Sequence, residues 1–173
     1  KLEQIGAMKA KQNERKKALL NKITELNNLW KDRFLLKQKE AENINARKDD
    51  ISIDVTYKGK REKFYDKLKE VFRGTSIRDS VYHDIVGKYQ DFIEIYRDES
   101  HLSDVLGINN VGIFVQRFHE RIDELLTYNV EDDVVFKYKG KSLDQHSLGQ
   151  RASALILFLL TQKGNNILII DQP

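Results

Sequence analysis

The chain has 173 residues, with 30 Lys or Arg against 27 Asp or Glu and a formal net charge of +3. Apolar residues make up 40%, enough for the core of one ordinary domain, while 33% charged residues indicate much exposed helix. Cysteine is absent, which excludes a disulfide framework and a thiolate metal site. No signal peptide opens the chain, and the apolar stretch at 152–160 is too short to span a bilayer. An intracellular, cytoplasmic protein is therefore expected.

The positive charge is concentrated at the start of the chain. Residues 1–48 hold 13 Lys or Arg against 6 Asp or Glu, and the remaining residues hold 17 against 21. A basic segment joined to a slightly acidic body is compatible with nucleic-acid contact, because Lys and Arg neutralise phosphates. The alternative is that these charges simply keep a helix solvated.

Residues 1–48 contain no Pro and only one Gly, Gly6, and their composition predicts one long helix. Large apolar residues recur along it at steps of three or four, which is typical of a coiled-coil seam. The seam consists of Leu19, Ile23, Leu26, Trp30 and Phe34. Only one helix of such a coiled coil is present in the sequence, so its partner is expected from outside the chain.

Residues 49–173 alternate between strand and helix signals. Residues 51–57 and 134–138 alternate apolar and polar side chains, which predicts two half-buried strands. Helical spacing predicts helices over 61–72, 77–97 and 111–128. The Gly-Thr-Ser turn at 74–76 is better explained as a helix C-cap followed by an N-cap than as a phosphate loop, since the Lys of a P-loop is missing. The acids at 131–133 are expected to be solvated loop residues, with a divalent-metal site as the alternative.

A polar turn, Ser147-Leu148-Gly149-Gln150, precedes an apolar helix that is predicted to start near Gln150 or Arg151. A helix N-terminus presents free N–H groups and a positive dipole end, and is therefore a natural anion site. Gly149 permits close backbone approach and Ser147 supplies a hydroxyl. The simpler alternative is that Ser147 is only an N-cap and Gly149 only a turn residue.

The last predicted element is a strand of four consecutive apolar residues, Ile167–Ile170, followed by Asp171. Such a run is typical of a parallel strand buried on both faces, and ligands bind at the C-terminal ends of such strands. A carboxylate there can hold Mg²⁺ beside nucleotide phosphates. The alternative is an Asp that starts a turn before Pro173.

In this order and spacing, the polar turn, the helix and the strand resemble the C-terminal half of an ABC-type ATPase head of the SMC/RecF kind. The run is particularly similar to TrlF-like and other coiled-coil-bearing bacterial ATPases. Residues 147–150 resemble the signature motif and 167–171 resemble Walker B. The resemblance implies an α-rich α/β fold, with a coiled-coil arm over 1–48 and the C-terminal lobe of a P-loop ATPase head over 49–173, truncated after Walker B.

The resemblance also implies site residues and partners. Two heads would form a homodimer around ATP and Mg²⁺, with Ser147 and Gly149 contacting the γ-phosphate in trans, Gln150 among the ATP-binding residues and Asp171 holding the metal. Gln172 would lie beside the attacking water, where many relatives carry a catalytic Glu. A carboxamide can orient water but cannot act as a general base, so slow hydrolysis is expected. Relatives couple this cycle to DNA maintenance or phage defence.

Two departures from that family pattern concern activity. His146 and Leu148 replace the usual Leu and first Gly of the signature motif. The Gly-x-x-x-x-Gly-Lys-[Ser/Thr] loop is nowhere in the chain, so the chain alone should be inactive. Two other functions remain open. One is a non-enzymatic coiled-coil interaction module, and the other is a basic nucleic-acid-binding helix on an α/β scaffold.

Overall fold

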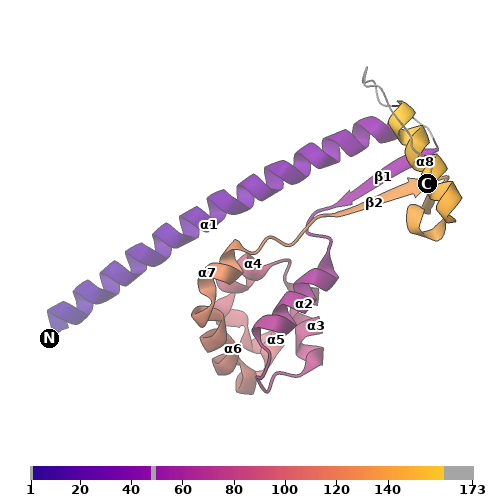
Figure 1. Cartoon of the computed structure of the whole chain (residues 1–173). Helices are drawn as coiled ribbons and strands as arrows, with labels where there is room; N and C mark the ends of the chain where they lie inside the picture. The colour runs from indigo at the N-terminus through magenta and orange to yellow at the C-terminus, as the bar shows by residue number, and fades with distance from the viewer. Residues whose placement is uncertain (1, 48–49, 162–173) are drawn as a thin grey trace. The chain divides into compact units, whose positions relative to one another are not determined.

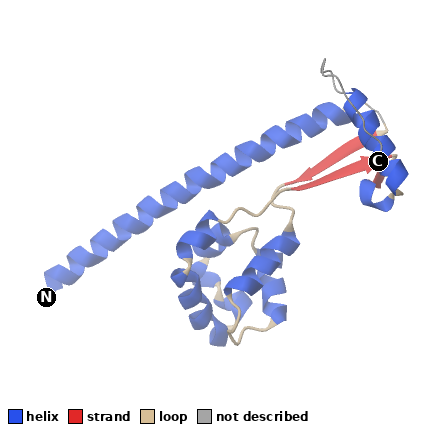
Figure 2. Cartoon of the chain, viewed as in Figure 1, coloured by secondary structure: helices blue, strands red, loops and turns tan. Residues whose placement is uncertain are grey.

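The computed structural model describes residues 2–47 and 50–161, and their elements are labelled in Figure 1. These residues form two compact units, which are described separately. The helical unit contains the described residues of 1–37 and 56–133, and the sheet unit contains those of 38–55 and 134–173. Helices predominate and are accompanied by a small sheet (Figure 2). The expected α-rich mixture of helices and strands is therefore confirmed.

The predicted long helix is present as α1, Leu2–Asn45, and continues from the helical unit into the sheet unit. Part of its predicted seam packs within the helical unit. Ile23 is buried in the core of that unit, and Leu19 and Trp30 pack against the same core. Phe34 lies against Tyr57, with the ring centroids 5.1 Å apart. The chain therefore supplies a packing partner for these residues, where the sequence led us to expect one from outside the chain.

The helical unit is built from short helices around an aromatic core. They are α2 (Arg61–Val71), α3 (Asp79–Lys88), α4 (Phe92–Arg97), α5 (Ser103–Leu106), α6 (Ile108–Glu120) and α7 (Ile122–Thr127). Phe64 and Phe92 meet edge to face with centroids 4.9 Å apart, and Phe72 and Phe114 stack at 4.2 Å. All four side chains are fully buried, so these pairs join α2, α4 and α6 through their largest apolar groups.

The helix predicted over 77–97 is two helices in the structure, because the chain breaks between α3 and α4. Asp91 is the N-cap of α4 and accepts a hydrogen bond from the Glu94 N–H (2.8 Å), while the Glu94 carboxylate accepts one from the Gln90 N–H (2.6 Å). The Arg61 guanidinium donates to the carbonyl oxygens of Val86, Tyr89 and Gln90 at the end of α3. These carbonyls and amides would otherwise bond to each other along one continuous helix.

Two further helix predictions are wrong in detail. The helix predicted over 111–128 is divided at Arg121 into α6 and α7, and Ile113 within α6 is 42% exposed. The predicted N-cap at 74–76 is also wrong, because α3 begins only at Asp79. Gly74 has a φ of 81°, a value that suits glycine at the turn after α2, as the sequence predicts.

The sheet unit centres on three antiparallel strands in the order β1-β2-β3. They are β1 (Ile51–Thr56), β2 (Asp133–Tyr138) and β3 (Lys141–Ser142). Ile51 and Ile53 are buried on one face of β1, as their alternation predicts. The Lys139-Gly140 turn between β2 and β3 has positive φ at both residues (51° and 78°), as a two-residue type I′ hairpin turn requires.

Within the sheet unit, side-chain hydrogen bonds connect the end of α1 to β1, and an ion pair connects β1 to β2. The Asn45 amide donates to the Ile53 carbonyl oxygen (2.9 Å), and its side-chain oxygen accepts from the Ile53 N–H (2.8 Å). Lys137 pairs with Asp54 at 2.5 Å across β2 and β1. After the hairpin, residues Leu143–Gln145 form a 3₁₀ turn that leads into α8, Leu148–Thr161.

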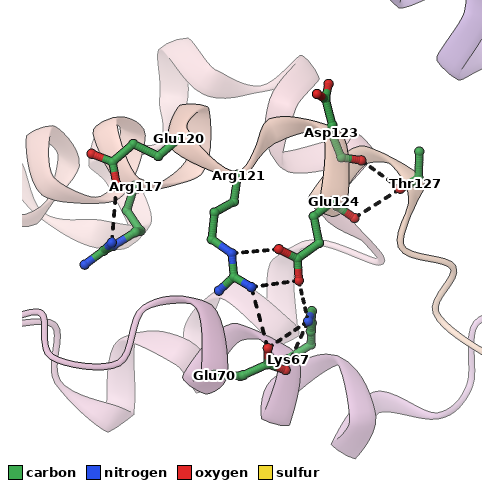
Figure 3. A network of polar contacts seen from close by, with 8 residues as sticks. All are labelled: Lys67, Glu70, Arg117, Glu120, Arg121, Asp123, Glu124 and Thr127. Carbon is green, nitrogen blue, oxygen red and sulfur yellow. Dashed lines mark hydrogen bonds and ion pairs between the residues drawn. The ribbon is translucent and has the colours of Figure 1, made fainter.

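A network of four charged side chains joins α2 to α7 in the helical unit (Figure 3). Lys67 Nζ lies 2.6 Å from Glu124 Oε1 and 3.0 Å from Glu70 Oε1. Arg121 Nε lies 2.6 Å from Glu124 Oε2, and Arg121 Nη2 lies 3.7 Å from Glu70 Oε1. The network is electrically neutral, and the break at Arg121 places that guanidinium between the two carboxylates.

The network predicts a small pH dependence of stability. The hydrogen bond from Lys67 holds the pKa of the Glu124 carboxyl below its ordinary value of 4.5, with a further contribution from Arg121. Because the folded pKa is the lower one, this stabilisation is complete above pH 4.5 and is lost as the pH falls through the folded pKa. The variant Glu124→Gln should be less stable than the unmodified chain by about 0.5 kcal/mol at pH 7, given solvent screening. In urea unfolding, the difference should shrink as the pH falls below 4.5, through the lowered pKa of the folded Glu124.

The matched control is Glu120→Gln, which removes the same charge from an exposed pair with Arg117 at the end of α6. It should produce a smaller change than Glu124→Gln at pH 7. Equal effects of the two variants would mean that the α2–α7 network contributes nothing beyond net charge.

Candidate functional site

The polar turn predicted to bind anions lies at the N-terminus of α8. Ser147 precedes the helix, which begins at Leu148 and not at Gln150 or Arg151 as the sequence suggested. The Gln150 N–H donates to Ser147 Oγ (3.4 Å), and Gln150 Oε1 accepts from the Ser147 N–H (3.1 Å). This reciprocal pair is a capping box, so Ser147 is the N-cap and Gln150 is the N3 residue that completes it.

The segment before the turn is held by two side chains. Arg151 folds back from α8, donating from Nε to the His146 carbonyl oxygen (2.8 Å) and from Nη2 to the Asp144 carbonyl oxygen (2.7 Å). His146 lies against Tyr138, with ring centroids 5.6 Å apart and His146 Nε2 3.0 Å from the Tyr138 carbonyl oxygen. A hydrogen bond from Ser142 holds the pKa of the Asp144 carboxyl below its ordinary value. The turn is therefore a defined structure anchored on β2.

The turn is open to solvent and sterically unobstructed. Ser147, Leu148, Gly149 and Gln150 are all exposed, and a Cβ added to Gly149 would meet no atom within 4 Å among the described residues. The first helical bond is from the Arg151 N–H to the Ser147 carbonyl oxygen (2.9 Å), so the earlier N–H groups have no partner inside the helix. This arrangement can accept an anionic group at the backbone of the first turn.

The remaining residues of the predicted site lie outside the part of the chain that the structure describes. They are the strand Ile167–Ile170, Asp171 and Gln172. Within residues 2–47 and 50–161, no three His, Asp or Glu side chains are grouped so as to hold a metal ion. The structure thus gives the geometry of the turn, while the predicted Mg²⁺ ligand and the residue beside the attacking water stay predictions.

The acidic cluster at 131–133 is paired with lysines. Lys63 contacts Glu131 (2.7 Å), Lys37 contacts Asp132 (2.8 Å) and Lys60 contacts Asp133 (2.6 Å). The expectation of solvated acids is wrong for Asp132, whose side chain is only 5% exposed. These ion pairs occupy the carboxylates and favour a structural role over a metal site.

The sequence analysis missed a buried ion pair, Lys58 with Asp91, whose side chains are 3% and 1% exposed. Lys58 begins a Lys-Gly-Lys sequence, which by itself indicates only a turn. Gly59 is required there, because a Cβ would lie 2.6 Å from Asp133 Cβ. A signal for Asp91 was present, since Asp91 and Glu94 have the spacing of a capping box inside the predicted helix.

No family model matches the chain, and no significant match is found among curated proteins or solved structures. None of the helices in the described residues combines the length and the apolar character needed to cross a membrane.

The capping box predicts opposite effects for two serine substitutions in the same helix. Ser147→Ala removes the N-cap acceptor and should weaken the start of α8 by about 1 kcal/mol. Ser153→Ala, at an exposed position within α8, should leave the helix unchanged or slightly more stable, since Ala has the higher helix propensity. Amide hydrogen exchange at Gln150 and Arg151 measures both effects. Equal exchange rates in the Ser147→Ala variant and the unmodified chain would contradict the capping role.

Proposed function

We propose that the chain is part of an SMC/RecF-like ATPase whose heads dimerise around ATP and Mg²⁺, with residues 147–150 as the signature motif. The observation that carries the proposal is the exposed turn at the N-terminus of α8, anchored on a β-hairpin and unobstructed at Gly149.

The capping role of Ser147 is compatible with phosphate binding. Its Oγ accepts from the Gln150 N–H, which leaves the hydroxyl proton free to be donated to an anionic oxygen. The backbone of Gly149 and the positive end of α8 add to the attraction. In the proposed dimer these groups contact the γ-phosphate of ATP held by the second head.

The remaining chemistry is assigned to residues beyond the described part of the chain. Asp171 would hold Mg²⁺, which neutralises charge on the phosphates when bound. Gln172 would orient water without accepting its proton. Since the P-loop is missing from this sequence, the chain alone should neither bind ATP well nor hydrolyse it.

One substitution separates the capping role from the phosphate role. Ser147→Asp keeps an N-cap acceptor, so α8 should form normally, but its carboxylate would face the γ-phosphate and repel it. In the full-length protein, we expect ATP-dependent dimerisation and hydrolysis to fall at least about 10-fold, equivalent to 1.4 kcal/mol. Ser147→Thr, which retains a hydroxyl, should keep most of the activity.

Two outcomes would contradict the ATPase proposal. One is an unchanged hydrolysis rate in the Ser147→Asp variant. The other is a parent coding region with no P-loop upstream of this segment. If the chain forms helical oligomers whose assembly does not change when ATP is added, the non-enzymatic interaction module is favoured instead.

Nucleic-acid binding by α1 is a second candidate, favoured by the exposure of its basic residues. Lys11, Arg15 and Lys17 are exposed on α1. Lys16 also lines an open cavity of about 410 Å³ together with Arg97 of α4. Such a basic surface can bind the phosphate backbone of a nucleic acid. It does not by itself recognise a particular base sequence.

The nucleic-acid candidate predicts a salt-dependent affinity that two charge deletions reduce. Lys11→Gln/Lys17→Gln should weaken binding of a labelled DNA duplex and make the slope of log K against log salt shallower by about 2. The control Lys31→Gln/Lys39→Gln removes the same charge from exposed positions farther along α1. Fluorescence anisotropy at several salt concentrations measures both. Equal slopes in the two variants would rule out a specific basic surface at the start of α1.

A further inference from the structure

The helical unit contains a buried polar cluster in which three segments of the chain meet. We call it the Lys58 cluster, and it consists of Asn27, Trp30, Tyr57, Lys58 and Asp91. Asn27 and Trp30 belong to α1, Tyr57 and Lys58 follow β1, and Asp91 is the N-cap of α4. The ATPase proposal assigns no role to any of these residues.

Lys58 is the centre of the cluster. Its ammonium donates hydrogen bonds to the Asp91 carboxylate and to Asn27 Oδ1, the latter at 2.8 Å. It also lies 4.8 Å from the ring centroid of Tyr57 and 5.9 Å from that of Trp30. The buried ammonium of Lys58 thus contacts a carboxylate, a carboxamide and two aromatic rings. The carboxamide (Asn27) and one ring (Trp30) belong to α1.

The backbone of Lys58 is held as firmly as its side chain. Its φ of 50° is unusual for a residue other than glycine, and its N–H donates to Asp132 Oδ1 (3.1 Å). The second oxygen of Asp132 accepts from Lys37 Nζ (2.8 Å), which also belongs to α1. Lys58 and Asp132 therefore hold α1 at two points, Asn27 and Lys37, about 15 Å apart along the helix axis.

Apolar packing attaches α1 to this unit along one stretch, residues 19–34, where Phe34 also lies against Tyr57. Of the described α1 side chains, Ile23 is the one fully buried in the core, while Leu19, Leu20 and Trp30 pack against it only in part. Leu29, Leu35 and Leu36 are exposed. This apolar contact and the polar contacts at Asn27 and Lys37 together hold α1 on the helical unit.

Asn27 and Trp30 of α1 contact a buried ion pair, Lys58 with Asp91, whose two members lie outside α1. Its desolvation cost nearly cancels its attraction, so it adds little net stability, but losing one partner leaves an uncompensated buried charge. A buried polar network of this kind specifies one arrangement of its members when each of them has a partner. We propose that the Lys58 cluster is a latch that holds α1 on the helical unit, and that α1 leaves as one rigid helix when the latch opens.

The test removes both charges of the latch together. Lys58→Met keeps the length of the side chain, and Asp91→Asn keeps the N-cap of α4, so the double variant should fold. The chain has no cysteine and can carry spin labels at Asn21→Cys on α1 and Asp84→Cys on α3, both exposed positions. We expect one narrow distance distribution without the latch substitutions, and a second population at longer distance, above about 10% of molecules, in the double variant.

Two further variants keep the test decisive. Lys63→Met/Glu131→Gln removes an exposed ion pair that does not contact α1, and it should leave the distance distribution unchanged. Asn27→Ala keeps both buried charges but removes the α1 acceptor, so it should give a smaller longer-distance population, with a red shift of emission from the single Trp, Trp30. A single narrow distribution in both latch variants would overturn the proposal.

Discussion

The helical unit depends on how the chain accommodates one buried cation. Lys58 cannot be left without a partner in that position, because an isolated buried ammonium is far more costly than a paired one. Asp91 meets this requirement and at the same time starts α4, so the break after α3 and the burial of Lys58 form one arrangement. Asn27 completes it from α1. The charge therefore sets the positions of three elements that apolar packing alone would leave less defined.

The chain uses the same device, a capping box, in two environments. At α4 the capping carboxylate of Asp91 is buried and its second oxygen is occupied by Lys58. At α8 the capping hydroxyl of Ser147 is exposed and retains a proton to donate. The two caps share the bond from the N3 N–H to the N-cap side chain, while the return bond comes from the Gln90 N–H at α4 and from the Ser147 N–H at α8. Exposure decides which cap can take part in binding.

Elements whose periodicity was unambiguous could be predicted from the sequence, including α1, α2 and the strands at Ile51–Thr56 and Asp133–Tyr138. The breaks within the longer helices could not, because the apolar stripe continues across Asp91 and Arg121 at helical spacing. The break after α3 combines the local Asp91 cap with hydrogen bonds from a distant residue, Arg61, to the end of α3. The same limit applies to Lys58, since nothing local to a Lys-Gly-Lys turn reveals that its partner lies 33 residues away.

The composition of α8 bears on the choice between the proposed functions. Apolar residues occupy most positions of this helix, and Leu155, Leu157 and Leu159 are exposed in the structure. A helix that is apolar on all sides belongs in the core of a large fold, whereas an interaction module of the coiled-coil type needs one apolar stripe. The helix that carries the Ser147 turn therefore fits a position inside an ATPase head better than one on the surface of a helical oligomer.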